Sequence, residues 1–472
     1  MQSRTDQQRL LEDATRAQAA ARDATSEAER VTRMANDTVL AMRGPVAPLT
    51  QAAREQPARP PAGGPVQMAS SPAPGQRPAA GQPAGAGMGT MGGMTPPGTL
   101  PGPEEPPRRA ILLPEIEARF GKMIESDAGL TERLVAFWSN HFATSIRKGG
   151  QMMALIPGME REAIRPNVHG RFEDMLLAVT RHPAMLFYLD ANQSFGPNSQ
   201  QGARRRRGLN ENLAREIMEL HTLGVGGGYT QADVTAFAAA LTGWSFYWQN
   251  DALGGNFVFW RGNHEPGDKT VLGRVYGDAG EAQAVSILRD LAIHPSTARF
   301  IATKLVAHFI ADDPPPALVR RVALAFLESR GDLAETTRAL VSAPEAWAGA
   351  QAKIRTPAEF VVATLRATGA RLPAQNLTGV LNNLGQPVFA PPSPKGFPDD
   401  VATWLAPDAL KSRLDWVSAF SGRFGERLDP VGLANDVLGG RLTDETLTAI
   451  RRAESRPQAL ALLLMSPEFQ RR

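Results

Sequence analysis

The chain has 472 residues, which is enough for one large or two ordinary globular units with additional sequence outside them. Its formal net charge is only +3. A protein that binds nucleic acid usually carries a larger basic excess, so we expect no nucleic acid partner. The absence of cysteine excludes disulfides, thiolate nucleophiles, cysteine-ligated zinc fingers and iron–sulfur clusters.

The N-terminal residues determine the expected localisation. They are polar from the first residue and contain no apolar core, so they do not form a signal peptide. No long apolar run occurs anywhere in the chain, and we therefore expect no transmembrane helix. A cytoplasmic protein is the direct expectation, with an extracytoplasmic one as the alternative if the true N-terminus lies further upstream. The sequence does not predict an oligomeric state.

Composition divides the chain into three segments. Residues 1–56 are polar and rich in Ala, Arg and Glu, and a helix formed there would have little apolar surface to bury. Residues 57–107 contain 14 Pro and 11 Gly but only four charged residues, which predicts a disordered linker. Residues 108–472 carry the periodic apolar pattern of a folded domain.

The folded segment is predicted to be mainly α, a multi-helix globular domain with a small β-hairpin insertion near residues 256–276. Apolar residues recur at three- and four-residue spacing, most clearly at 130–142 and 171–179. Two short β-prone runs, at 256–261 and 269–276, flank the turn-rich stretch GNHEPGD. We expect these two runs to pair with each other as the hairpin.

Helix boundaries are indicated by a proline pattern that recurs four times. An apolar helix ends at a residue followed by proline, and a new helix begins, at Pro183, Pro295, Pro344 and Pro467. Proline suits the first turn of a helix, where its missing N–H needs no partner, and it forces the residue before it out of the helical region. His182 and His294 stand at this preceding position, so we expect both to be helix N-caps.

The central motif GLNENLAREIMELHTLGVGGGYTQADVTAFAAALTGW predicts two capped helices. Asn210 can cap a helix over residues 211–223, which Gly224 would end in a left-handed conformation. Thr230 and Asp233 have the spacing of a capping box, with Asp in place of Glu, so a second helix begins there.

Glu216 and Glu219 lie on the polar face of the first of these helices. They are candidates for a paired catalytic acid and base, while an ion-pair network with Arg215 is the favoured structural alternative. On a regular helix His221 lies at least about 140° from both carboxylates, so these three side chains would not bind one metal ion.

Several blocks of the sequence together resemble a known family. They are FWSNHFATS at 137–145, RHPAMLFYLD at 181–190, NENLAREIMELHTLGV at 210–225 and LGQPVFAPPSPKGFPD at 384–399. Their order resembles the bacterial domain-of-unknown-function family 1800, over about residues 108–472. The resemblance supplies no catalytic residues. It implies a protein partner encoded nearby, because relatives are often encoded beside a second, export-linked family.

All seven histidines fall between residues 141 and 308. We single out His141, His221 and His264 as candidate ligands of a transition metal such as zinc, iron or copper, assisted by Glu216 or Glu219. The alternative is that each histidine caps a helix or bonds a backbone carbonyl. His308 is expected to be a packed interior or rim residue.

Two classes of function remain open from the sequence. The favoured one is a non-catalytic accessory or assembly factor that works with a co-encoded exported partner, because no motif has the geometry of a known chemistry. The alternative is a metal-dependent hydrolase or oxidoreductase with a His/Glu site. The enzyme hypothesis predicts that the candidate residues line one pocket. The accessory hypothesis predicts that they are buried and mutually satisfied, with an apolar patch exposed elsewhere.

Overall fold

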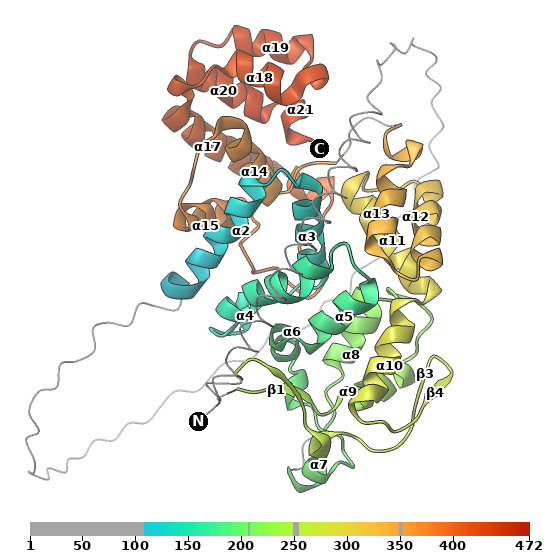
Figure 1. Ribbon diagram of the computed structural model, residues 1–472. Helices are drawn as coiled ribbons and strands as arrows, with labels where there is room; N and C mark the ends of the chain where they lie inside the picture. The colour runs from blue at the N-terminus through green and yellow to red at the C-terminus, as the bar shows by residue number, and fades with distance from the viewer. Residues whose placement is uncertain (1–107, 206–207, 249–253, 349–352) are drawn as a thin grey trace, which may run out of the picture. The chain divides into compact units, whose positions relative to one another are not determined.

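The computed structural model describes residues 108–205, 208–248, 254–348 and 353–472. The segments predicted over residues 1–56 and 57–107 lie outside these ranges. Helices dominate the described chain, which confirms the predicted mainly α fold (Figure 1). None of the helices within these ranges is both long and apolar enough to span a lipid bilayer.

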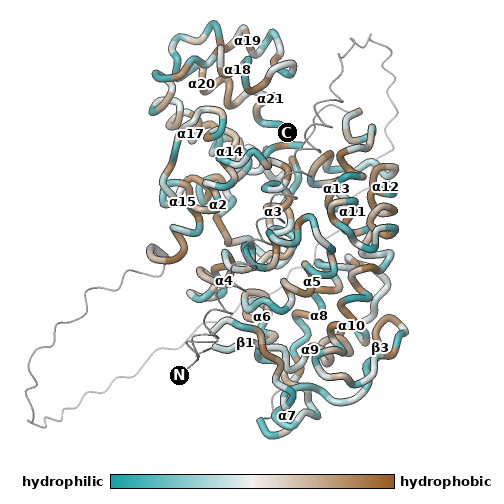
Figure 2. Tube along the Cα trace, in the orientation of Figure 1, coloured by the Kyte–Doolittle hydropathy of each residue, from teal (hydrophilic) through white to brown (hydrophobic). Residues whose placement is uncertain are grey.

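The larger of two apolar clusters is formed by helices from the first part of the described chain. These helices are α3 (Gly129–His141), α4 (Met152–Met159), α5 (Phe172–Arg181), α6 (Pro183–Tyr188), α8 (Asn212–Glu216), α9 (Gln231–Leu241), α10 (Glu281–Ala292), α11 (Pro295–Phe309), α12 (Pro316–Glu328) and α13 (Leu333–Val341). Apolar and polar residues alternate along the helices (Figure 2). In α12, for example, Leu318, Val322 and Phe326 recur every four residues and are all buried, as expected for one helix face.

The smaller cluster joins the first described helix to the end of the chain. It is formed by α2 (Leu113–Glu125), α14 (Pro357–Thr368), α15 (Ala374–Asn383), α17 (Pro407–Phe424), α18 (Pro430–Leu438), α19 (Asp444–Arg451), α20 (Arg456–Met465) and α21 (Pro467–Gln470). Helix α2 packs directly on α14 and α15. Residues far apart in the sequence therefore share one core.

Shorter elements connect these helices. Two are the α-helices α7 (Gln200–Arg205) and α16 (Val401–Trp404). Single turns of 3₁₀ helix occupy Ile146–Lys148, Arg165–Asn167, Ala191–Gln193, Arg261–Asn263, Pro344–Ala346, Gly425–Arg427 and Gly439–Arg441. Turns of π-helix occupy Arg108–Leu112, Glu160–Ile164 and Ile217–His221.

The β structure corrects the predicted pairing. Strands β2 (Phe257–Phe259) and β3 (Lys269–Val271) fall within the predicted runs, but they do not pair with each other. Strand β2 pairs antiparallel with β1 (Trp244–Phe246), and β3 pairs antiparallel with β4 (Arg274–Tyr276). The β3–β4 turn explains the difference. Leu272 and Gly273 both have positive φ, as a two-residue hairpin turn requires, so β3 pairs with its immediate neighbour.

The predicted helix caps at His182, His294 and Thr230 are present, whereas the N-cap of α8 is Glu211 and not Asn210. The Nδ1 atoms of His182 and His294 each accept a hydrogen bond from the backbone N–H two residues later, at 3.1 Å. Thr230 and Asp233 form the reciprocal capping box that begins α9. Asp233 also accepts a hydrogen bond from the N–H of Leu272 at 2.7 Å, so this capping residue fixes the β3–β4 turn as well.

The predicted regular helix over residues 211–223 is wrong in its second half. Helix α8 ends at Glu216, and a turn of π-helix follows. The hydroxyl of Thr222 donates to the carbonyl of Ile217 at 2.6 Å, which supports the wider turn. Gly224 then takes the predicted left-handed conformation, with φ of 82°. A Cβ at this position would lie 2.7 Å from the Phe300 ring, so glycine is also required by close packing.

Candidate functional site

The two candidate carboxylates, Glu216 and Glu219, are partly exposed beside the π-helical turn. Neither makes a hydrogen bond or ion pair with another residue in the described ranges. Arg215, which we expected to neutralise them, instead pairs with Glu211 at 2.8 Å. Burial and the neighbouring charge of Glu219 raise the pKa of Glu216. The Arg–Glu network favoured from the sequence is therefore not formed with these two carboxylates.

His264 lies in the loop that follows β2. Its hydrogen bond to Thr242 joins this loop to the residue that follows α9. Its Nδ1 lies 3.0 Å from the carbonyl oxygen of Thr242, which can only accept, so Nδ1 carries the proton. Its ring packs against Phe259 at a centroid distance of 5.3 Å. Burial is the main cause of its lowered pKa. These contacts are those expected of a structural histidine that bonds a backbone carbonyl.

His141 and His221 lie close together, as they would have to if both were ligands of one metal ion. Their ring centroids are 6.0 Å apart, and the Nε2 of His141 lies 3.1 Å from the backbone carbonyl of His221. Because that carbonyl accepts, Nε2 is protonated, and the buried Nδ1 keeps a lone pair with no partner in the part of the chain that the structure describes. No group of three or more His, Asp or Glu side chains in the described part of the chain is arranged to hold a metal ion.

His141 belongs to a row of side chains on α3 that faces a second row of side chains on α11. Helix α3 lies between α2 and α11 (Figure 1). We define the α3–α11 seam by Arg133, Phe137 and His141 of α3 and Phe300, Lys304 and His308 of α11. The members of each row are four residues apart, which places them on one helix face. Ring contacts join Phe137 to His308 at 5.2 Å and His141 to Phe300 at 6.3 Å, so the two helices run antiparallel.

Lys304 is the unusual member of the seam. It is partly exposed, its ammonium lies 5.6 Å from the Phe300 ring centroid, and no carboxylate of the described chain lies within ion-pair distance of it. Burial lowers its pKa to about 8, and Asp399 offsets this effect only in part. Its charge in turn helps lower the pKa values of His141 and His221, for which burial is the larger cause. Near neutral pH the amine is therefore partly uncharged.

His308 is held by a carboxylate at the same seam. Its Nδ1 lies 2.5 Å from Oδ2 of Asp399, while its Nε2 is buried and has no hydrogen-bond partner among the described residues. Burial, then the charges of Arg472 and Arg133, lower the pKa of His308 well below its ordinary value. Burial raises the pKa of Asp399 to about 7, although Lys353 opposes the shift. A neutral imidazole with one free nitrogen is the result.

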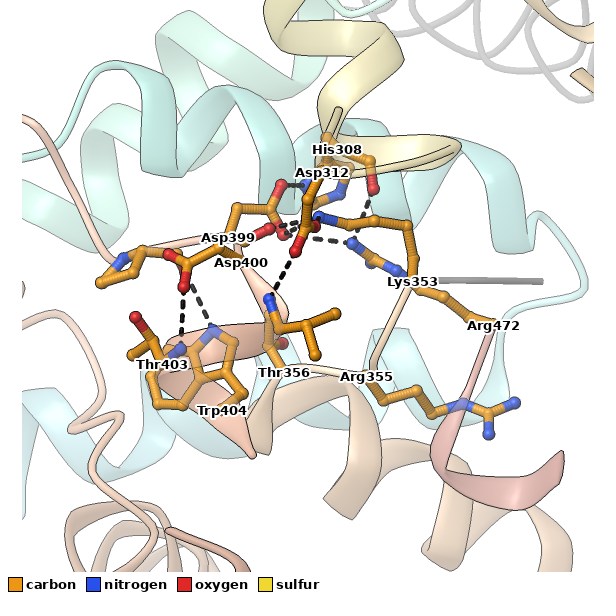
Figure 3. A network of polar contacts seen from close by, with 12 residues as sticks. His308, Asp312, Lys353, Arg355, Thr356, Asp399, Asp400, Thr403, Trp404 and Arg472 are labelled. Carbon is orange, nitrogen blue, oxygen red and sulfur yellow. Dashed lines mark hydrogen bonds and ion pairs between the residues drawn. The ribbon is translucent and has the colours of Figure 1, made fainter. Parts of the chain in front are cut away.

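An ionic network holds Asp399 in place (Figure 3). The ammonium of Lys353, which is only 1% exposed, lies 2.6 Å from Oδ1 of Asp312 and also donates to the backbone carbonyl of Asp399. Arg472 donates to the backbone carbonyl of His308 at 2.8 Å and pairs with Glu359 and Asp399. Buried ion pairs of this kind fix geometry more than they add stability. Here they fix the relative positions of four segments that are distant in sequence.

A cavity of about 120 Å³ lies against a neighbouring face of α3. Its walls include Ser139, which donates to Glu160 at 2.9 Å, and Arg119, which pairs with the same carboxylate at 2.7 Å. His308 and Asp399 also belong to its walls. None of the five residues predicted from the sequence lines this cavity. The expectation that they share one pocket is therefore not met at this cavity.

The sequence interpretation missed Lys304 and Asp399, and it assigned His308 only a packing role. A signal was present, because Lys304 and His308 stand four residues apart in a mainly apolar stretch, IATKLVAHFI. Asp399 ends one of the blocks that carried the family resemblance. Their convergence depends on contacts across 91 residues of sequence, which periodicity does not show.

The fold and the seam together define a mainly helical protein in which a lysine, unpaired within the described residues, lies among neutral imidazoles. The chain belongs to the family described as protein of unknown function DUF1800, whose model matches residues 3–471. This match confirms the family that the sequence blocks resemble, and it extends to residues before 108. No match was found among curated proteins or among solved structures.

Proposed function

We propose that the protein is an enzyme that binds a small organic anion at the α3–α11 seam and transfers protons there. The observation that carries this proposal is Lys304, a cation without a carboxylate partner in the described chain, close to imidazoles whose free nitrogens also lack partners. Unpartnered polar groups in a protein interior require an explanation, and perturbed ionisable groups cluster at functional sites.

The charge balance favours an anion. Lys395 is exposed, forms no ion pair with a described residue, and lies close enough to Lys304 to lower its pKa further. Two unpaired cations attract a negative ligand, and more strongly where burial reduces the local dielectric. An anion beside Lys304 would also offset the charge that suppresses protonation of His141.

The proton chemistry rests on His141 and His308. Each is neutral and has one ring nitrogen without a partner within the described ranges. A hydrogen bond at the other nitrogen orients each ring, from His141 to the His221 carbonyl and between His308 and Asp399. A neutral imidazole oriented in this way is the usual arrangement of a general base. Lys304 would act as the adjacent acid.

A metal-dependent enzyme, the alternative raised by the sequence, receives less support. His141 and His221 provide two nitrogens, and a structural or catalytic zinc site usually has three or four protein ligands. The positive charge of Lys304 also opposes a cation at this position. A transition metal held there would need further ligands from the substrate or solvent.

Titration calorimetry tests the proposal with a panel of small carboxylates and inorganic phosphate. We expect at least one anion to bind the wild-type chain, and Lys304→Met to weaken it by about tenfold or more. Lys122→Met is the matched control, because Lys122 is an exposed lysine of α2 that has no ion pair with a described residue. If no anion binds, or if both variants bind equally well, the proposal is wrong.

The accessory function favoured from the sequence remains the second candidate, supported by exposed aromatic residues on the β1–β2 ribbon. Trp248 is 46% exposed and Trp260 is 44% exposed. The Trp260 ring packs 5.7 Å from the Tyr247 ring. Exposed aromatic side chains are frequent anchors of protein interfaces. We propose this ribbon as the contact site if the protein works with a co-encoded exported partner.

Co-purification with the product of the neighbouring gene tests the accessory candidate. Trp260→Ala should reduce complex formation. Trp347→Ala, which removes an equally exposed tryptophan next to α13, should leave it unchanged. A complex that forms equally well with both variants would rule out the ribbon as the contact site.

A further inference from the structure

We infer that Lys304 is a nucleophilic amine that forms an imine with small aldehydes or keto acids. This inference names the substrate class of the α3–α11 seam and therefore rests on the function proposed above. It requires three conditions at the seam: an amine that is not locked in an ion pair, neighbouring groups that exchange protons, and access for a small molecule.

The first condition is clearest when Lys304 is compared with Lys353 in the same region. The Lys353 ammonium is almost fully buried and lies 2.6 Å from Asp312, so its proton is held by a carboxylate. Lys304 has no such partner in the described chain and lies beside the ring of Phe300. A carboxylate partner stabilises the protonated, unreactive amine, and an aromatic wall does so far less. Lys304 is therefore the better nucleophile of the two.

The second condition concerns the protons that imine formation must move. The amine nitrogen adds to the carbonyl carbon, and the new C–N bond forms as the carbonyl oxygen takes up a proton. The nitrogen then loses a proton to give a carbinolamine, whose hydroxyl takes up a second proton and leaves as water as the C–O bond breaks. Loss of the last N–H proton gives the imine, so that no oxidant or reductant is needed. His141 and His308 each have a ring nitrogen without a partner among the described residues, and Lys304 lies close enough to both to lower their pKa values. These imidazoles would accept and return the protons.

The third condition concerns access and the choice of substrate. Lys304 is partly exposed, unlike the fully buried His141. Lys395, exposed and unpaired among the described residues, lies near it and would meet a carboxylate on the bound molecule. A small 2-oxo acid combines the carbonyl group that Lys304 needs with the negative charge that the site favours.

Reductive trapping tests the inference on the full chain. The protein is incubated with glyoxylate, or with propanal as an uncharged aldehyde, in the presence of cyanoborohydride, and the modified lysines are identified by peptide mass spectrometry. We expect Lys304 to be labelled by glyoxylate at least about tenfold faster than the exposed Lys122, and faster than by propanal. If Lys304 is labelled no faster than Lys122, the inference is wrong.

Lys304→Arg separates this inference from the proposed function. Arginine keeps the positive charge but forms no imine under these conditions, so labelling at position 304 should be lost while anion binding in calorimetry falls less than in Lys304→Met. Anion binding that depends on Lys304, without trapping in the wild type, would refute the imine and leave the anion site intact. Rapid trapping without any anion binding would support the imine and refute the anion site. Circular dichroism of each variant confirms that it is folded.

Discussion

Removal of the Lys353 charge provides the strongest test of the ionic network. The Lys353 ammonium is only 1% exposed and neutralises two carboxylates, Asp312 at 2.6 Å and Asp399 at 3.7 Å. The substitution Lys353→Met keeps the length and the apolar stem of the side chain while it removes the charge. Both carboxylates then remain partly buried without this partner.

The expected loss follows from the exposure of the three groups. Breaking a buried ion pair by removing one partner costs about 3–5 kcal/mol, because the remaining charge is left uncompensated. Asp312 and Asp399 are 35% and 28% exposed, so water compensates them in part. We therefore expect a decrease in the free energy of unfolding near the lower limit, about 3 kcal/mol.

Urea unfolding followed by circular dichroism measures this change. Lys411→Met is the matched control, because its 2.6 Å ion pair with Asp415 is exposed on both sides and should contribute less than about 1 kcal/mol. The double variant Lys353→Met with Asp312→Asn should recover part of the loss, since it removes one of the stranded charges. If Lys353→Met lowers the free energy of unfolding no more than Lys411→Met does, the ionic network does not hold Asp399 in place.

Three further predictions concern Asp399, His141 and the glycine loop. Burial raises the folded-state pKa of Asp399 to about 7, above its ordinary value, so its contribution to stability is full below about pH 4 and is lost as the pH rises through 7. Asp399→Asn should therefore flatten the pH dependence of the urea midpoint, and an unchanged slope would contradict the raised pKa. Burial and Lys304 keep the pKa of His141 well below its ordinary value, so ¹⁵N NMR should find a neutral ring protonated at Nε2 at about pH 6.5, where an ordinary histidine is half charged. A charged ring at that pH would refute this. Gly224→Ala should cost about 1–3 kcal/mol more than Gly226→Ala, because both have positive φ but only the first would place a Cβ 2.7 Å from Phe300. Equal losses would show that this contact is unimportant.

The sequence by itself determined the helical class and many of the helix boundaries. His182 caps the helix that begins at Pro183, and Thr230 with Asp233 caps α9. Each of these interactions joins residues no more than three positions apart, so the chain specifies them without reference to the rest of the fold. The family could be identified from sequence blocks for a related reason, since the order of the blocks is a property of the chain alone.

The tertiary structure decided which strands pair and where the central helix changes its period. Strand β2 pairs with β1 because the β3–β4 turn already satisfies β3. The π-helical turn at Ile217–His221 carries the His221 carbonyl that accepts from His141, a contact across 80 residues. Helical periodicity assumes a regular turn, so it does not reveal a local change stabilised by long-range contacts.

The tertiary structure also decided the candidate site. From the sequence, Glu216 and Glu219 were the best candidates for catalytic carboxylates, because they stand close together along one helix. The carboxylate that lies against a histidine of the α3–α11 seam is instead Asp399, which lies 91 residues from its partner His308. Lys304 acquires its chemistry in the same way, since its lowered pKa results from burial, which only the packed fold creates. Residue type and spacing are written in the chain, whereas burial and long-range proximity arise only when distant segments pack together.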